Sequence, residues 1–345
     1  MSRRAAPKAS SPAARSAEGS PVNAAVTNAP DGKATAVLVV ISFALALALM
    51  FSPLASPEAP VGIAFWSATA VLAVLASVGI RRVAAIQGTG SGLYASMTAA
   101  LFGIWIVYFW QLLVVAAEVP RVLLPSPALI VSALWENLGT LGGDFVQTVV
   151  KAVFVGWALG CSLGFLVAIA IDRMPFLQRG LLPIASLTSA IPLVGVAPIA
   201  IMWFGFEWPS KAAVVVLMTF FPMLVSTLAG LQASQRLERE LMHSYAASYL
   251  RTLWSLRLPS AVPFMFAALK VNASLALIGA IVAEFFGSPT TGLGFRISTE
   301  ALKMNMTLVW AAVVVAAVTG STAYALLTRL ERKVAFWHPS IRGRR

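Results

Sequence analysis

Charged residues are scarce in this chain of 345 residues, where Asp, Glu, Lys and Arg together make up 11%. A soluble domain carries about 25% charged residues, so a soluble protein of this size would lack the polar surface it needs. Hydrophobic residues account for 59%. Several apolar runs reach about 20 residues, enough to cross about 30 Å of hydrocarbon. The composition therefore predicts an all-α integral membrane protein, a polytopic helical bundle.

Cysteine and histidine are almost absent. Cys161 stands alone, which excludes a disulfide within the chain, and His243 and His338 are far apart in sequence. These residues are too few for a metal or haem site. The glycine-rich segment 88–93 lacks the following Lys-Ser or Lys-Thr of a phosphate loop. No nucleophile, base and acid stand in a catalytic pattern. We therefore expect no catalytic residue, no metal and no cofactor bound by this chain.

We expect eight membrane spans, which the apolar runs place at 34–54, 61–80, 94–117, 148–171, 181–204, 210–230, 260–283 and 306–328. Residues 1–33 are rich in Ala, Ser and Pro and are too polar to pack a core, so we expect a disordered tail. Gly and Pro interrupt the fourth and fifth spans, whose limits are the least sharp.

The basic residues give the predicted orientation. With the N-terminus in the cytoplasm, 19 Lys and Arg residues fall on the cytoplasmic side and five on the outer side, while Lys270 falls within a span. This asymmetry is the positive-inside pattern, and it predicts that both termini are cytoplasmic. It also accounts for the net charge of +12 without nucleic acid as a partner.

Residues 126–138 form an amphipathic pattern outside the spans. Ser126 suits an N-cap and Pro127 suits the first helical position. We expect a helix here that lies along the outer membrane interface.

The cytoplasmic loop 231–258 is the longest polar stretch between spans. Leu241, Tyr245, Tyr249 and Leu253 recur in it at helical spacing, and Pro259 predicts a break before the next span. Two interpretations remain open on this pattern. The segment is either a solvated connector helix on the membrane surface or a docking helix for a soluble partner.

The loop resembles the coupling loop of ABC-importer permeases, whose pattern is Glu-Ala-Ala, three residues, Gly, nine residues, Ile, one residue, Leu-Pro. With Leu258-Pro259 as the anchor, Glu240 takes the Glu position and Leu256 the Ile position. Leu241 and Met242 replace the two alanines. Ala246 replaces the glycine, and alanine favours a continuous helix where glycine permits a left-handed backbone.

The rest of the chain, from about 122 to 340, resembles the nitrate, sulfonate and taurine branch of these permeases. The residues that carry the resemblance are Leu124-Pro125-Ser126-Pro127, Ile191-Pro192, Ala197-Pro198, Trp203-Phe204-Gly205, Val282-Ala283-Glu284, Gly292-Leu293-Gly294 and Trp337-His338-Pro339. The first three spans match less of the pattern.

The resemblance implies a permease core of the type I ABC-importer class at 94–335. Beside it we expect an additional N-terminal hairpin at 34–93 and a basic cytoplasmic tail at 336–345. The implied partners are ABC ATPases that use ATP and Mg, an extracytoplasmic solute-binding protein, a second permease copy and membrane lipid. The implied coupling residues are Glu240, Leu241, Tyr245, Ala246, Arg251, Leu258 and Pro259.

The fifth span is a candidate pathway wall or hinge, because prolines free backbone carbonyls in a membrane helix. Its candidates are Pro192, Gly195, Pro198 and Trp203. The alternatives are an ordinary kinked packing helix and, for Trp203, a place in the interfacial aromatic belt.

The seventh span carries two charges, Lys270 and Glu284. They lie about 21 Å apart along a helix axis and cannot pair directly. Each could be a gate residue or could snorkel to its own interface. Asn272 and Ser274 lie between them and could face the pathway or a neighbouring helix.

Two other classes of protein remain as alternatives. An ion-coupled secondary transporter would need a relay of intramembrane carboxylates or histidines, and only Glu284 comes near. A membrane enzyme or redox subunit would need paired histidines or clustered acids. The resemblance points to import of a small solute, either an anion such as nitrate, a sulfonate or taurine, or a vitamin-precursor heterocycle. Lys270 and Arg296 are slight indications of an anion.

Overall fold

The structure is a computed structural model that describes residues 32–50, 63–86, 92–174, 176, 193–287 and 290–337. Every regular element in these ranges is a helix, which confirms the all-α prediction. Predictions for the tail before residue 32, for Pro192 and for residues 338–339 lie outside the described ranges. The helices divide into two compact units, the second of which begins at Val107 within a helix. Each unit is described by itself.

The first unit contains α1 (Gly32–Met50), α2 (Ile63–Ile86) and the first part of α3 (Gly92–Ala116). Gly79 of α2 brings the side chains of Leu38 and Val39 close to the α2 backbone. Phe43 of α1 stacks on Trp105 of α3 with ring centroids 5.0 Å apart. Many other apolar side chains of these helices are exposed, as expected for surfaces that face lipid.

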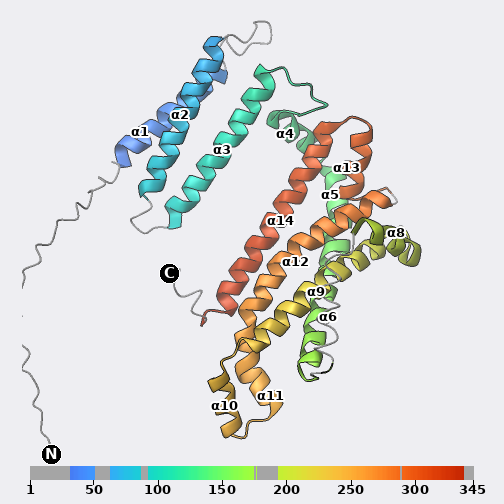
Figure 1. The fold of residues 1–345 in the computed structure, drawn as a ribbon. Coiled ribbons are helices and arrows are strands. Elements are labelled where there is room, and N and C mark those ends of the chain that lie inside the picture. The colour runs from blue at the N-terminus through green and yellow to red at the C-terminus, as the bar shows by residue number, and fades with distance from the viewer. Residues whose placement is uncertain are drawn as a thin grey trace, which may run out of the picture. The chain divides into compact units, whose positions relative to one another are not determined.

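The second unit holds the remaining helices (Figure 1). They are α4 (Pro127–Glu136), α5 (Leu138–Phe145), η3 (Val146–Phe154), α6 (Val155–Asp172), α8 (Leu193–Phe204), α9 (Trp208–Gln232), α10 (Arg236–Ser244), α11 (Tyr249–Thr252), η4 (Leu253–Arg257), α12 (Leu258–Phe286), α13 (Leu293–Leu302) and α14 (Met306–Val334). The segments η3 and η4 are π-helical. Figure 1 shows α10 and α11 at one end of α12 and α13 at the other. We call these the loop end and the α13 end.

Six helices in the described ranges are long and apolar enough to cross a membrane. They run over Ile63–Ala85, Met97–Ala116, Leu138–Asp172, Trp208–Gln232, Tyr249–Phe286 and Met306–Val334. The predicted first and fifth spans appear as the shorter apolar helices Ala34–Leu49 and Gly195–Phe204. Both predicted spans extend into residues outside the described ranges, so the count of eight stays a prediction.

The fourth span begins earlier than its predicted start at 148. One helix runs through α5, η3 and α6 from Leu138 to Asp172. Gly139, Gly142 and Gly143 lie within this helix, although each glycine weakens a helix by about 1 kcal/mol relative to alanine. Packing overrides that preference, since Leu141 is buried and Asp144 is fully buried on the same helix.

Three glycines of α6 set its packing against α9. Gly156, Gly160 and Gly164 recur every fourth residue and face α9. A Cβ added to Gly160 would lie 2.1 Å from Thr219 Oγ1, and one added to Gly164 would lie 2.5 Å from the carbonyl oxygen of Phe220. Small residues at this spacing let membrane helices approach closely, so van der Waals contact and backbone polarity hold the pair together.

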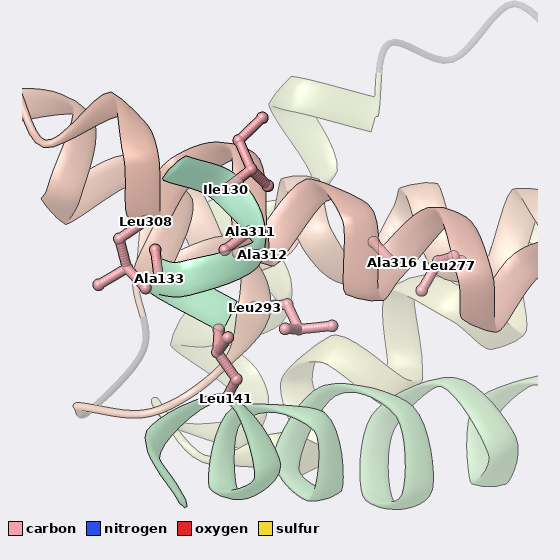
Figure 2. Packing of buried hydrophobic residues seen from close by; sticks show 9 residues of the cluster. All are labelled: Ile130, Ala133, Leu141, Leu277, Leu293, Leu308, Ala311, Ala312 and Ala316. Carbon is pink, nitrogen blue, oxygen red and sulfur yellow. The ribbon is translucent and has the colours of Figure 1, made fainter. Parts of the chain in front are cut away.

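An apolar cluster closes the α13 end (Figure 2). Its buried members come from five helices and are Ile130, Ala133, Leu141, Leu277, Leu293, Leu308, Ala311, Ala312 and Ala316. Alanines of α14 supply the flat surface on which α4 lies, as Figure 2 shows for Ala311 and Ala312 beside the α4 ribbon.

The predicted helix after Pro127 is present as α4. Ser126 is its N-cap and Pro127 stands in the first turn, but the Ser126 side chain makes no capping hydrogen bond. The side chain of Gln111 supplies the capping acceptor instead, because Gln111 Oε1 accepts a hydrogen bond from the Ala128 backbone N–H at 3.1 Å. Ile130 and Ala133 are buried against the cluster, while Trp135 is exposed on the opposite face. The amphipathic pattern is therefore confirmed, and its place at a membrane interface stays a prediction.

Candidate functional site

The 231–258 loop starts with a well-capped helix, α10. The Gln235 backbone N–H donates to Glu238 Oε2 at 2.9 Å, as one half of a reciprocal capping box. Glu240 pairs with Arg236 one turn earlier at 2.7 Å, and both side chains are exposed. No residue of α10 is buried. Its position is therefore fixed from its two ends rather than by packing along its length.

Ala246 turns the chain at the end of α10. Its φ is +51°, in the left-handed region. The Ala246 N–H donates to the His243 carbonyl at 2.9 Å, and the Ala247 N–H donates to the Met242 carbonyl at 3.0 Å. This pair of bonds is a Schellman motif, which glycine ordinarily occupies. The expectation that alanine continues the helix is wrong, because the two bonds offset about 1–2 kcal/mol of left-handed strain.

The helical spacing predicts that Leu241, Tyr245, Tyr249 and Leu253 share one helix, but the turn divides them into two pairs. Leu241 and Tyr245 lie on α10 or its C-cap, whereas Tyr249 and Leu253 lie on α11 and η4. The predicted helix break at Pro259 is also absent. One helix runs from Tyr249 through η4 into α12, with the proline in the first turn of α12. Proline costs little at the start of a helix, where its missing N–H is not needed.

Several large apolar side chains of the loop are mostly exposed. Leu237, Leu241 and Tyr245 follow one another at four-residue spacing along α10 and are 73%, 56% and 78% exposed. Leu250 and Trp254 are also mostly exposed. Arg251, by contrast, is an exposed basic residue on α11 whose backbone N–H donates to the Ser248 N-cap at 3.4 Å. Contiguous apolar surface on a polar loop is typical of a protein-binding site.

The base of the loop is held by a group that we call the Asp172 clamp, consisting of Asp172, Tyr249 and Arg257. The Arg257 guanidinium donates to both Asp172 carboxylate oxygens, at 2.6 and 2.7 Å. The Tyr249 hydroxyl donates to Asp172 Oδ2 at 2.9 Å. Arg257 Nε also donates to the Leu231 carbonyl at the end of α9, at 3.0 Å. The clamp therefore brings α6, α9 and the loop to one point.

An apolar cluster lies beside the clamp. Leu231, Leu253 and Ala261 are its buried members, and Tyr249 and Leu258 pack against it. Leu258, one of the predicted coupling residues, thus stabilises the foot of the loop rather than its exposed face.

Lys270 lies in an ion pair between α12 and α14. Its Nζ is 2.8 Å from Glu331 Oε2, and it also lies 5.9 Å from the centre of the Tyr324 ring. The predicted separation from Glu284 is confirmed, since each residue has its own partners. A lysine with a carboxylate partner is poorly placed to attract a second anion.

Asn272 faces neighbouring helices. It is fully buried, and its Nδ2 donates to the Thr219 carbonyl at 2.8 Å and lies 3.3 Å from Cys161 Sγ. These contacts join α12 to α9 and α6. Ser274 lies on another face of α12 and is exposed. Of the two alternatives, the helix contact therefore describes Asn272, and Ser274 stays a pathway candidate.

Glu284 belongs to a group at the α13 end that we call the α13 cluster, with Asp144, Thr148 and Arg296. The Glu284 carboxylate accepts hydrogen bonds from the Thr148 hydroxyl and the Gly294 backbone N–H, both at 2.7 Å. Its side chain is 2% exposed. Snorkelling to the interface is therefore wrong for Glu284, because the first turn of α13 already satisfies its charge.

Asp144 completes the cluster. It is fully buried, accepts the Gly292 N–H at 2.8 Å and pairs with Arg296 at 2.8 Å. Thr148 accepts the Leu293 N–H at 2.8 Å. Side chains from two other helices thus cap α13, whose own N-cap residue, Gly292, has no side chain to do so.

Glycine is required where the cluster closes. The φ of Gly292 is +136°, and a Cβ there would lie 2.6 Å from the Glu284 carboxylate. A Cβ on Gly294 would lie 2.3 Å from the Ile281 carbonyl oxygen. The Gly-Leu-Gly motif therefore exists because a carboxylate and a helix backbone occupy the space of two side chains.

The remaining fifth-span candidates lie on α8. Gly195, Pro198 and Trp203 are exposed, with Pro198 inside the helix. Trp203 lines an apolar groove of about 850 Å³ between α6 and the α8–α9 pair. These residues do not contact the loop or the α13 cluster in any described interaction, so the predicted pathway residues do not form one site.

The sequence reasoning missed Asp144, Thr148 and Asp172. Asp144 and Asp172 stand at the two ends of one long apolar helix. Ionisable residues in such positions are rare and have partners, and that was the available signal. Their partners could not be identified, because Arg296 and Arg257 are distant in sequence.

Several known proteins resemble this chain. Residues 160–336 match the family described as binding-protein-dependent transport system inner membrane component. The formylaminopyrimidine transport permease protein ThiX of Halalkalibacterium halodurans is 29% identical over 244 residues, which cover 71% of this chain and 97% of the relative. The riboflavin transport system permease protein RibX of Chloroflexus aurantiacus is 30% identical over 236 residues, covering 68% and 88%. The taurine transport system permease protein TauC of Escherichia coli is 26% identical over 211 residues, covering 61% and 73%.

Proposed function

Because the chain belongs to the binding-protein-dependent transport system inner membrane components, which are ABC transporter permeases, we propose that α10 is where a separate ATPase docks. The observation that carries the proposal is the exposed apolar row Leu237, Leu241 and Tyr245. It stands on a short helix that no other helix covers within the described ranges, and a rigid turn follows it. Such a row fits a hydrophobic groove on a soluble partner.

The proposed mechanism is alternating access. ATP and Mg bind to the ATPase partner, whose closure moves the 231–258 loop. The loop then tilts the helices that continue from it, so that a central pathway opens alternately to each side. The comparisons give no support to an ion-coupled transporter. The described carboxylates Asp144, Asp172, Glu284 and Glu331 are all engaged in ion pairs or hydrogen bonds.

The protein is a multi-pass inner-membrane protein, and its orientation is part of the proposal. The excess of basic residues supports a cytoplasmic position for the loop end and both termini. The α13 end then faces the extracytoplasmic solute-binding protein. A second permease copy would face the exposed side of α12, on which Phe264, Val271, Ser274 and Ile278 lie at intervals of seven, three and four residues.

We propose a small solute as the substrate, in keeping with the names of the relatives, which refer to taurine, riboflavin and formylaminopyrimidine. Lys270 and Arg296 give little support to an anion in particular, because both already pair with carboxylates. Selection by the binding protein accounts for specificity without a charged site in this chain.

The docking proposal is tested by co-purifying the tagged protein with its candidate ATPase. We compare wild type with Leu241→Asp and Glu240→Lys, and use Leu302→Asp as a matched control, since Leu302 is 86% exposed at the α13 end. We expect wild type and the control to retain the ATPase and both loop variants to lose it. Retention by Leu241→Asp would refute docking through α10. A well-folded wild type that retains no ATPase would return ion-coupled transport to consideration.

A further inference from the structure

The Asp172 clamp is a buried polar link between the loop and a helix that is not its neighbour in sequence. Asp172 ends α6, whereas Tyr249 and Arg257 belong to the loop, 77 and 85 residues further along the chain. The Asp172 side chain is 5% exposed and the Arg257 side chain 13%. Arg173 adds to the link, with its guanidinium carbon 5.7 Å from the centre of the Tyr249 ring.

The geometry of the clamp is specific. The two terminal guanidinium nitrogens each donate to one carboxylate oxygen, Nη1 to Oδ2 and Nη2 to Oδ1, which is the bidentate arrangement that fixes angle as well as distance. The third guanidinium donor, Nε, reaches the Leu231 carbonyl at the end of α9. A lysine at 257 could satisfy one of these contacts but not all three, because its ammonium is a single point charge.

Few other contacts hold the loop. No residue of α10 is buried, and the apolar contacts at the foot of the loop are centred on Leu231, Leu253 and Ala261, with Ile169 of α6 packed against this cluster. Leu231 and Ala261 lie on α9 and α12, the two helices that flank the loop in sequence. Without the clamp, α6 would receive the movement of the loop only through these flanking helices and the apolar packing of Ile169.

We infer that the Asp172 clamp makes the loop and α6 move as one body, so that displacement of α10 by the docked ATPase reaches α6 directly. Asp172 and Arg257 are positioning residues in this account, and neither needs to touch the ATPase. The inference rests on the proposed docking function and adds the route by which docking is converted into movement.

The test measures movement separately from docking. In a Cys161→Ser background, which removes the native cysteine, a reporter cysteine replaces Ser162 on an exposed face of α6. A second reporter replaces Ser274 on α12, which continues directly from the loop. The complex with the ATPase is treated with a maleimide, with and without Mg-ATP and vanadate. Each reporter is combined with Asp172→Asn, with Arg257→Gln, with both together and with Tyr249→Phe.

The expected result separates the two reporters. In the wild-type clamp, ATP and vanadate change the labelling rate of both cysteines by about fivefold or more. In Asp172→Asn and Arg257→Gln the ratio at the α6 reporter falls well below its wild-type value, while the ATPase is retained and the α12 reporter keeps its wild-type ratio. The double variant is no worse than the worse single one, because both substitutions break the same contact. Tyr249→Phe, which removes only a hydroxyl, gives an intermediate ratio.

Three outcomes would overturn the inference. An unchanged α6 ratio in variants that retain the ATPase shows that the clamp transmits nothing. Loss of the ATPase in Tyr249→Phe and Asp172→Asn shows that the clamp only shapes the docking surface. Equal loss at both reporters shows a general defect in the bundle. If the wild-type protein itself retains no ATPase, the failure lies with the proposed docking and not with the clamp.

Discussion

The two ends of the second unit differ in how their polar groups are buried and hydrogen-bonded. At the α13 end, Asp144 and Glu284 are fully or almost fully buried, and each accepts a backbone N–H of α13. At the loop end, the mostly buried ion pair of the Asp172 clamp holds the base of the loop, and α10 beyond it exposes an apolar row. The buried carboxylates at the α13 end have their hydrogen-bond partners within the chain. The loop end leaves its apolar surface for another protein.

This contrast indicates where substitutions should affect folding and where they should affect assembly. Buried donors and acceptors that lose a partner cost about 1–3 kcal/mol each. Exposed apolar residues cost little when they are replaced. The predictions below test this division, beginning with the largest expected effect.

Gly294→Ala should be the most damaging of these substitutions. Its Cβ would lie 2.3 Å from the Ile281 carbonyl oxygen and 2.9 Å from Glu284 Cβ, and neither atom lies at the end of a flexible side chain. We expect a loss of stability of about 3 kcal/mol from overpacking. The measurement is the fraction of protein that remains monodisperse after heating in detergent. Gly142→Ala is the matched control, because its Cβ meets nothing within 4 Å; an equal loss there would contradict the explanation.

Glu284→Ala should be the next most damaging. It removes the acceptor for the Thr148 hydroxyl and the Gly294 N–H, and we expect a loss of about 2–3 kcal/mol in detergent melting experiments. Glu284→Gln keeps one acceptor oxygen and should lose less. If both variants melted like wild type but the protein failed to transport, Glu284 would be a gate residue rather than part of the α13 support.

Ala246→Gly should stabilise the loop slightly. Glycine adopts the left-handed conformation without strain, so we expect a gain of about 1 kcal/mol in the turn. Hydrogen exchange with mass spectrometry should show slower exchange at the Ala247 N–H, which donates to Met242. Ala247→Gly serves as a control outside the left-handed region and should not slow exchange. Faster exchange in Ala246→Gly would show that the turn is not a Schellman motif in solution.

The smallest expected effect is a pH dependence at Glu300 in α13. Burial raises the pKa of this carboxyl, but hydrogen bonds from Lys303 and Asn305 outweigh it, and on balance its pKa is lowered. A lowered pKa stabilises the fold above the ordinary value of 4.5, and the gain is lost as the pH falls through the lowered value. We expect about 0.5 kcal/mol. The measurement compares the melting temperatures of wild type and Glu300→Gln at pH 7 and at pH 4. If the difference between the two proteins were the same at both pH values, the Glu300 carboxylate would not contribute to the pH dependence of stability.

Sequence patterns predicted the helices well and their polar contacts poorly. Apolar runs and caps depend on neighbouring residues, so α4 and the long spans could be found from the sequence alone. The Asp172–Arg257 and Asp144–Arg296 pairs join residues 85 and 152 positions apart, and no local rule connects them. The error at Ala246 has a local cause. Alanine favours a continuous helix, but the two C-cap hydrogen bonds of the turn hold it in the left-handed region.

The glycine row of α6 limits which parts of the protein can slide during a transport cycle. Gly156, Gly160 and Gly164 seat the ridge of α9 so closely that a single added carbon would meet atoms at 2.1–2.6 Å. Moving one helix along the other by a residue would bring larger side chains into that space. We therefore expect α6 and α9 to move as one rigid unit. Relative movement during transport should then occur where this unit contacts other helices. Spectroscopic distances between labels on α6 and α9 should then stay constant in every state of the transporter.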